Sequence, residues 1–190
     1  AAPDGAWALF GSGTPTMDIT TPSHLHLTAP ASGSVLLRGY ARAIPSVPFT
    51  VTTKLAAHTL DVSQNHSPLV GLGLREAATG KSYHVILACE GGGAYSVKIK
   101  NQYWSNLTGS TITNGDATPA TTGYGLLRPI YLRWVVTSQT DIRSYFSYDG
   151  LVYIPVGTAS ANPGFTFDEV GFVLYAATLS VSLEAMFDWV

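Results

Sequence analysis

The sequence of 190 residues predicts an all-β chain, a two-sheet antiparallel jelly-roll sandwich that forms a single domain over residues 1–190. No stretch of ten or more residues repeats its apolar side chains with a helical period of 3.6. Short segments rich in Val, Thr, Tyr and Leu recur instead, separated by clusters of Gly, Pro, Asn and Ser, as is typical of sandwiches and barrels. No break in composition divides the chain, which favours one domain.

The individual strands follow from apolar alternation and from the turn-forming residues between them. We expect strands at residues 7–10, 19–21, 25–28, 35–40, 49–56, 69–76, 82–89, 94–100, 130–138, 141–148, 153–158, 169–176 and 180–190. The segment 102–126, rich in Thr, Gly and Asn, is expected to be a long loop. The final strand needs partners for its backbone, and we expect it to pair with the strand at 7–10.

Alternation is clearest in the strand at 130–138. Ile130, Leu132, Trp134 and Val136 fall on one face, and polar side chains fall on the other. The same pattern recurs in 180–190, where Phe187 and Trp189 share the apolar face. Each sheet is therefore expected to cover a core with one face and to meet solvent or a partner with the other.

Charged residues make up 12% of the chain, about half the roughly 25% usual in soluble domains. This low charge has two interpretations: an extracellular β-rich domain, or a surface that contacts other protein subunits. A net charge of −2 without a basic stripe argues against nucleic acid as a partner. No apolar run approaches the ~20 residues of a membrane span, so no membrane insertion is expected.

Two segments carry a family resemblance. Residues 131–136 (YLRWVV) and 144–150 (SYFSYDG) are similar to a hairpin common in concanavalin A-like lectin/glucanase domains, including laminin-G-like ones. Segments 70–75, 169–172 and 185–189 fit the same family in order. The resemblance implies a concanavalin A-like sandwich. As a turn, Asp149-Gly150 also has a purely structural explanation, since Gly adopts positive φ without steric cost.

The first fifty residues resemble a narrower group. Trp7 and the segments 25–30, 37–39 and 48–51 look like the openings of jelly-roll domains in tailed-phage virion proteins. This resemblance implies a virion surface location and partners that are other virion or self subunits.

The residues argue against an enzyme. Glucanases of this superfamily place carboxylates alternately along one strand, and retaining glycosidases need two carboxyl groups about 5 Å apart. Here Asp168 and Glu169 point to opposite faces of a strand, and Glu184 and Asp188 lie ~13 Å apart along one. No Gly-x-Ser-x-Gly motif is present. The scattered histidines and aspartates predict neither a metal site nor a cofactor.

The first predicted ligand site lies at the end of one strand and the start of the long loop. Aromatic rings beside amide side chains fit the recognition of a glycan or a protein. The residues are Asn101, Gln102, Tyr103, Trp104 and Asn106. The alternative is that Trp104 caps the core as the chain leaves the sheet.

The second predicted site is the outer face of the hairpin formed by 130–138 and 141–148. Its residues are Tyr131, Arg133, Arg143 and Tyr145. Cross-strand contacts between Tyr and Arg are also ordinary sheet stabilisation, which is the alternative interpretation.

Three functions remain open. The first is a non-enzymatic virion structural or surface module, a phage tail, fibre or capsid-decoration protein, that takes part in assembly and in attachment to cell-surface glycan. The second is a secreted carbohydrate-binding module or lectin, which would be extracellular. The least favoured is a glycoside hydrolase, because the paired carboxylates are missing.

Overall fold

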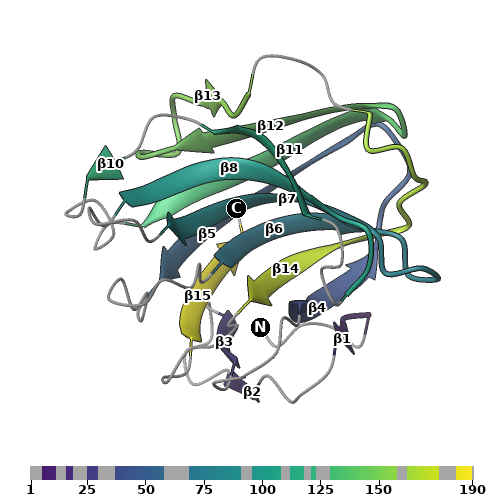
Figure 1. The fold of residues 1–190 in the computed structure, drawn as a ribbon, viewed down its shortest axis with the longest axis horizontal. Helices are drawn as coiled ribbons and strands as arrows, with labels where there is room; N and C mark the ends of the chain where they lie inside the picture. The colour runs from purple at the N-terminus through teal and green to yellow at the C-terminus, as the bar shows by residue number, and fades with distance from the viewer. Residues whose placement is uncertain are drawn as a thin grey trace.

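The computed structural model describes residues 6–11, 16–18, 25–29, 37–57, 69–90, 96–107, 112–117, 121–122, 129–157, 162–175 and 183–189. These residues form strands and turns, and within them no helix is long and apolar enough to cross a membrane. The strands lie in two antiparallel sheets that form two layers, with β6, β7 and β8 drawn over β5 and β11 in Figure 1.

The first sheet has eight strands in the order β1-β4-β14-β6-β7-β8-β10, and β9 also pairs with β8. Their bounds are β1 Ala8–Phe10, β4 Leu37–Ala43, β6 Leu69–Arg75, β7 Ser82–Glu90, β8 Ser96–Trp104, β9 Ile112–Ala117, β10 Thr121–Thr122 and β14 Glu169–Tyr175. Neighbours that are distant in sequence, such as β4 and β14, require crossovers between the layers.

The second sheet has seven strands in the order β13-β12-β11-β5-β15-β3-β2. Their bounds are β2 Thr16–Asp18, β3 Leu25–Ala29, β5 Phe49–Ala57, β11 Ile130–Ser138, β12 Asp141–Ser147, β13 Ile154–Pro155 and β15 Leu183–Trp189. Two antiparallel sheets joined by such crossovers make a jelly-roll sandwich, which confirms the predicted fold class.

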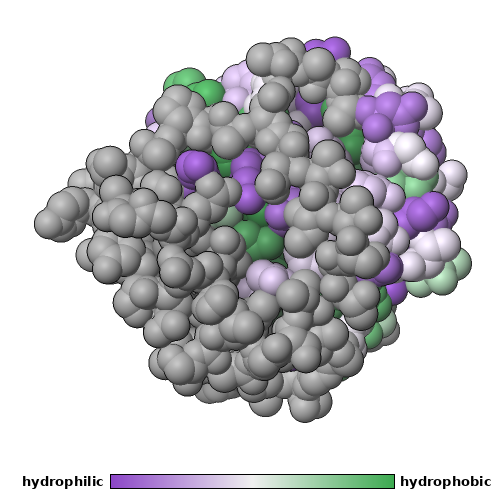
Figure 2. All heavy atoms as spheres, in the orientation of Figure 1, coloured by the Kyte–Doolittle hydropathy of each residue, from purple (hydrophilic) through white to green (hydrophobic). Residues whose placement is uncertain are grey.

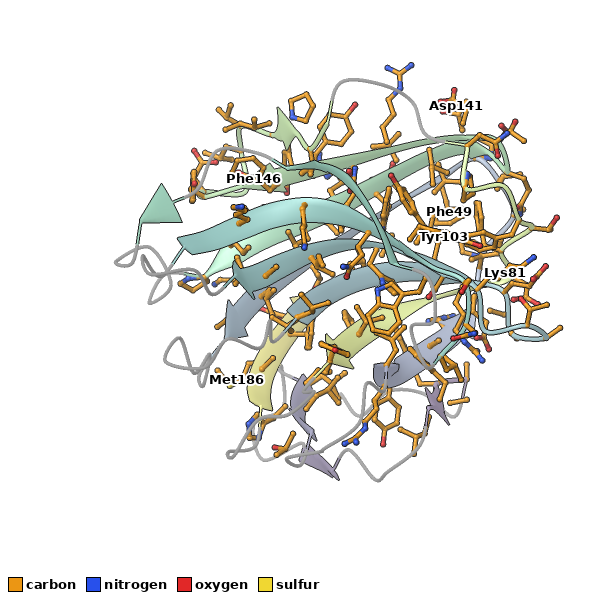
Figure 3. The ribbon with its side chains drawn as sticks, viewed as in Figure 1. Phe49, Lys81, Tyr103, Asp141, Phe146 and Met186 are labelled. Atoms are coloured by element: carbon orange, nitrogen blue, oxygen red, sulfur yellow. The ribbon has the colours of Figure 1, made fainter. Side chains whose placement is uncertain are left out.

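The main core fills the space between the sheets, where the side chains drawn in Figure 3 meet. Ile130, Leu132, Trp134 and Val136 are buried in it, as their alternation predicts. The facing layer contributes Leu72 and Phe172 among others. Burial of apolar area at roughly 25 cal/mol per Å² is what holds the two layers together.

The prediction of a long loop at 102–126 is wrong in part. Strand β8 continues to Trp104, and β9 and β10 both pair with it. The sequence of β9, ITNGDA, lacks the apolar alternation from which strands are predicted, so it did not indicate a strand. The strand expected at 19–21 lies outside the described residues, and β2 lies just before it.

The pairing predicted for the final strand is also wrong. Strand β15 lies between β3 and β5, whereas β1 pairs with β4 in the other sheet. An interior place satisfies the backbone of β15 on both edges and buries Ala185 and Phe187, which the three-residue β1 could not do. Trp7, just before β1, stacks on Phe172 at 5.2 Å between ring centres.

Candidate functional site

The outer face of the eight-stranded sheet is built from alternate residues of β6, β7 and β8. The register places Ser82 between Arg75 and Trp104, and two residues further along it places His84 between Gly73 and Gln102. Since side chains on a strand alternate between faces, Ser82, His84, Gln102 and Trp104 all project from this outer face.

This face is concave. Trp104 belongs to the row of Ser82 and Arg75, whereas Tyr175 pairs with Leu69, six residues further along β6. In a flat sheet six residues span about 20 Å. The rings of Trp104 and Tyr175 nevertheless meet at 5.2 Å between centres, edge to face. The sheet therefore curls inward between the end of β8 and the opposite end of β14.

A second apolar cluster fills much of the concave face. Its buried members are Phe10, Leu37, Ala41, Leu69, Ile86, Ala88, Trp104 and Val173. Leu107 and Tyr175 pack against them, and the carbonyl of Leu107 accepts a hydrogen bond of 3.0 Å from the amide of Leu37. The segment that follows β8 is therefore tied across to β4. Seen from this side, Figure 2 shows hydrophobic and hydrophilic residues together near the middle of the view.

Glycine makes room for the larger side chains of this face. A Cβ on Gly73 would lie 2.5 Å from Cδ2 of His84, so the imidazole packs directly on the backbone of β6. The ring of Trp104 lies beside this imidazole, with 6.3 Å between ring centres. Substitution of Gly73 by a larger residue would displace the imidazole from its place.

Polar atoms without partners concentrate on the same face. Both ring nitrogens of His84, Oγ of Ser82 and Nε of Arg75 are buried and make no hydrogen bond. By contrast, Nε1 of Trp104 donates to Oε1 of Gln102 at 3.0 Å. Native proteins pair nearly all their buried polar groups. Three adjacent side chains with unpaired atoms therefore make this part of the concave face the candidate site.

Burial lowers the pKa of His84 to about 3, since a buried imidazole is costly to charge. The side chain is therefore neutral at physiological pH. A neutral imidazole offers one N–H donor and one nitrogen acceptor. The unpaired hydroxyl of Ser82, two residues along β7, adds a group that can both donate and accept.

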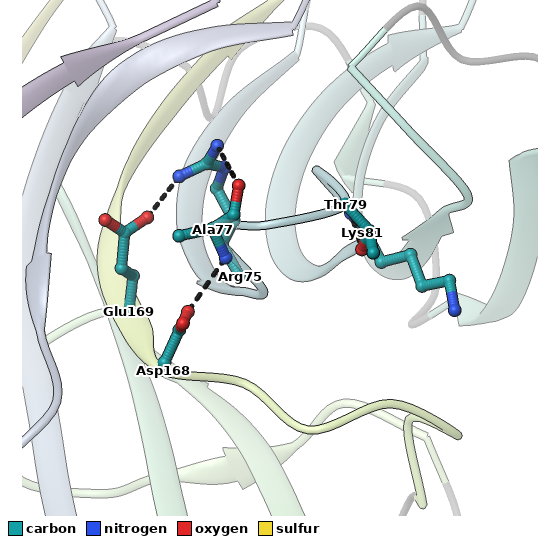
Figure 4. Close-up of polar contacts among 6 residues, drawn as sticks. All are labelled: Arg75, Ala77, Thr79, Lys81, Asp168 and Glu169. Atoms are coloured by element: carbon teal, nitrogen blue, oxygen red, sulfur yellow. Dashed lines mark hydrogen bonds and ion pairs between the residues drawn. The ribbon is translucent and has the colours of Figure 1, made fainter.

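One end of the concave face is fixed by charge, as Figure 4 shows. Arg75 forms an ion pair with Glu169 across two paired strands and donates to the carbonyl of Ala77. Asp168 accepts a hydrogen bond of 2.8 Å from the amide of Ala77. The carboxylates of Glu169 and Asp168 thus stabilise the β6–β7 turn, through the ion pair with Arg75 and the hydrogen bond from Ala77.

The first predicted ligand set is divided by the pleat of β8. Gln102 and Trp104 lie on the concave face, whereas Asn101 and Tyr103 point between the sheets. Asn101 donates to the carbonyl of Val156 at 2.9 Å, and Tyr103 contacts the ring of Phe165. Asn106 lies half-buried beyond the end of β8. Trp104 is fully buried, within the apolar cluster of the concave face.

The second predicted set lies together on one face. In the β11–β12 hairpin Arg133 pairs with Tyr145, Val135 with Arg143 and Tyr131 with Ser147. All four predicted residues project from the outer face of the seven-stranded sheet. Sequence reasoning missed three neighbours on that face, Thr52, Lys54 and Tyr153, although the alternation of Thr52 and Lys54 with Leu55 could have indicated the first two.

The described residues contain no group of three or more His, Cys, Asp or Glu side chains that could hold a metal ion. Asp188 lies opposite Lys54 in the ladder, and Glu184 lies opposite Thr28 four residues away. The register thus places these two residues four positions apart along β15, and Asp188 lies on the outer face of the seven-stranded sheet together with Lys54.

No protein-family model matches the sequence, and no curated protein matches it either. Solved structures do resemble it. The glycoside hydrolase family 43 protein BlXynB of Bacillus licheniformis, in a mutant form, aligns over 90% of this chain at 18% identity and a TM-score of 0.64. The alignment covers 33% of that protein.

Two similar structures are described as binding modules or were solved with sugar bound. The CBM2 module of the evolved Dit protein from Lactobacillus casei BL23 phage J-1 aligns over 97% of this chain and 90% of its own, at 10% identity and a TM-score of 0.59. The exoplasmic/lumenal domain of VIP36, bound to Ca²⁺ and Man3GlcNAc, aligns over 96% and 82%, at 11% identity and a TM-score of 0.55. At such identities the likeness establishes the fold. The chain has an all-β fold of two antiparallel sheets, a jelly-roll sandwich.

Proposed function

We propose that the chain is a non-enzymatic carbohydrate-binding module whose ligand site is the concave face of the eight-stranded sheet. The observation that carries the proposal is the group of unpaired polar atoms on Ser82 and His84 beside the indole of Trp104. Sugar hydroxyls both donate and accept hydrogen bonds, so they match these groups. An aromatic ring beside them supplies the surface on which a sugar ring packs.

Binding at this site requires a small opening. Ser82, His84 and Trp104 are all buried, and the indole lies between the imidazole and Tyr175. Rotation of the Trp104 side chain would break its bond to Gln102 and expose the imidazole. The indole could then stack on the bound sugar, and the sugar hydroxyls would replace the hydrogen bond that was lost.

A non-enzymatic role is supported by the carboxylates. Among the described residues, the acidic side chain on the concave face opposite Arg75 is Glu169, and it is held by that arginine. A glycosidase needs two carboxyl groups that face one scissile bond. The similar structures include a glycoside hydrolase as well as binding modules, so the distinction rests on these residues.

The test is a glycan array followed by calorimetry with the best neutral oligosaccharide. We expect Trp104→Ala and His84→Phe each to weaken binding about tenfold, the effect of losing roughly 1.4 kcal/mol. Tyr103→Phe, in the same strand on the opposite face, is the matched control and should bind normally. An array without hits, or unchanged binding by both variants, would overturn the proposal. Circular dichroism verifies that each variant is folded.

A second function, a structural module on a virion surface, is supported by an exposed apolar turn. Leu151 and Val152 are 85% and 68% exposed, and Tyr148 and Ile154 beside them are also exposed. Asp149 holds this turn through the amides of Leu151 and Val152. Rigid, exposed aliphatic groups are typical of contacts between subunits. Light scattering should show multimers that Leu151→Ser with Val152→Ser dissociates, and a strictly monomeric chain would exclude this role.

A further inference from the structure

The outer face of the seven-stranded sheet carries a group of cations that the concave site does not use. Lys54 on β5, Arg133 on β11 and Arg143 on β12 all project from it. Tyr131, Tyr145 and Tyr153 lie among them, each half-buried. Among the described residues of this face the three cations are accompanied by two acids, Asp141 and Asp188, so one positive charge is in excess, in a chain whose net charge is −2.

Arg133 is fixed in place at the centre of this group. Its guanidinium carbon lies 3.4 Å from the centre of the Tyr153 ring, in a cation–π contact. Its Nε donates to Oγ1 of Thr52 at 2.9 Å. In the part of the chain that the structure describes, its two terminal nitrogens have no hydrogen-bond acceptor and no carboxylate partner. A guanidinium held by its face and by Nε presents its remaining donors to a ligand without further loss of entropy.

The neighbours of Arg133 are held as well. The ring of Tyr131 lies against Gly150, where a Cβ would come within 2.9 Å of it, and Nζ of Lys54 lies 5.9 Å from the centre of that ring. Arg143 is more than half exposed, with Asp141 at 3.8 Å. Asp141 and Asp188 thus flank the group, beside Arg143 and Lys54, and neither pairs directly with Arg133 in the ladder.

We propose that this face is a second binding site, specific for an acidic saccharide whose carboxylate pairs with Arg133. A carboxylate accepts two parallel hydrogen bonds from a guanidinium, which gives strength and orientation. The tyrosine rings and hydroxyls around it suit the faces and hydroxyls of sugar rings. The residues opposite and diagonal to Arg133 are mostly hydroxyl-bearing or cationic, which suits a sugar better than the apolar centre of a protein interface.

The proposal does not depend on the concave site, and matched ligands separate the two. The probes are a short oligogalacturonate and the same oligomer with its carboxyl groups methyl-esterified, titrated by calorimetry at low salt. We expect the acid to bind and the ester to bind at least tenfold more weakly. Affinity for the acid should fall as salt rises, because the pair is only half-buried.

Variants assign the binding to the face. Arg133→Met should abolish binding of the acid. Arg133→Lys should retain only part of it, since lysine keeps the positive charge but cannot donate two parallel hydrogen bonds to a carboxylate. Lys81→Gln is the charge-matched control, because Lys81 lies on the β6–β7 turn away from this face (Figure 3). Trp104→Ala should leave binding of the acid intact even if it abolishes binding of neutral sugars.

Three outcomes would overturn the second site. The acid and its ester could bind equally well, Arg133→Met could bind like the unmodified chain, or the acid could fail to bind at millimolar concentration. A polyglutamate that bound as tightly as the oligogalacturonate would also overturn it, because the partner would then be an acidic protein segment.

Discussion

Nε1 of Trp134 donates a hydrogen bond of 3.1 Å to the carbonyl of Leu72. The two residues lie in different sheets, β11 and β6, and both are fully buried. A buried indole N–H usually has a hydrogen-bond acceptor. Here the acceptor is the backbone carbonyl of Leu72, which lies in the opposite sheet. This bond therefore helps to fix how the two layers sit on each other, in addition to the apolar area that they bury.

Trp134→Phe should destabilise the fold by roughly 1–3 kcal/mol, from the lost hydrogen bond and the smaller ring. Urea unfolding followed by circular dichroism measures the change, and the dependence on urea should stay the same because the fold is kept. A variant as stable as the unmodified chain would mean that the bond across the core contributes nothing.

A second link between the sheets is polar. Oγ of Ser144 donates to Oδ1 of Asn101 at 2.7 Å, and Nδ2 of Asn101 donates to the carbonyl of Val156. Asn101→Ala would leave Ser144 and Val156 with fewer partners, so we expect a loss of about 1–3 kcal/mol. Ser144→Ala should cost less in the Asn101→Ala background than alone. Strictly additive losses in this double-mutant cycle would show that the two side chains act independently.

How far sequence predicts this molecule differs between strands and sites. Alternation located β5, β7, β11 and β12 closely, because one buried face imposes a period of two on each. It could not assign the partners of β15, since pairing between distant strands leaves no local signal. The faces on which the members of the first predicted ligand set lie could not be assigned from sequence for a related reason. Residues that are adjacent in sequence look like one cluster if they lie in a loop. Because strand β8 continues to Trp104, alternate members of this run point to opposite faces of the sheet.

The hairpin face, by contrast, could be predicted, because Arg133 and Tyr145 needed only a correct antiparallel register. The unpaired atoms of Ser82 and His84 could not. They result from the curvature of the whole sheet and from the contact of His84 with Gly73, which only the assembled fold defines.

The turn at Asp149 should make the free energy of unfolding depend on pH in the acidic range. Its carboxylate accepts hydrogen bonds from the amides of Val152 and Leu151 and from the hydroxyl of Ser147, and these bonds lower the pKa of Asp149. A lowered pKa means that the stabilisation is present above the unfolded pKa of about 3.9 and is lost as pH falls through the lower folded value. Asp149→Ala should therefore be less stable than the unmodified chain at neutral pH and nearly equal to it at the lowest pH, as measured by urea midpoints. A difference that does not change with pH would contradict this.

His84 should give a second dependence on pH, at higher values. Its folded pKa is about 3, whereas the unfolded value is about 6.5. Between these pH values the imidazole is protonated in the unfolded chain but not in the folded chain. The free energy of unfolding is therefore greatest above about pH 6.5 and falls by up to about 1.4 kcal/mol per pH unit below it. His84→Leu should flatten this part of the profile of urea midpoints against pH.

The same variant separates stability from binding. Leucine fills the space without polar atoms, so replacing two unpaired ring nitrogens should leave the fold as stable at neutral pH or about 1 kcal/mol more stable. Binding of neutral sugars should weaken about tenfold, as in His84→Phe. Natural chains keep a costly buried polar group mainly where it has a function. A His84→Leu chain that was clearly less stable at neutral pH would mean that the imidazole has partners in the fold and is retained for structure.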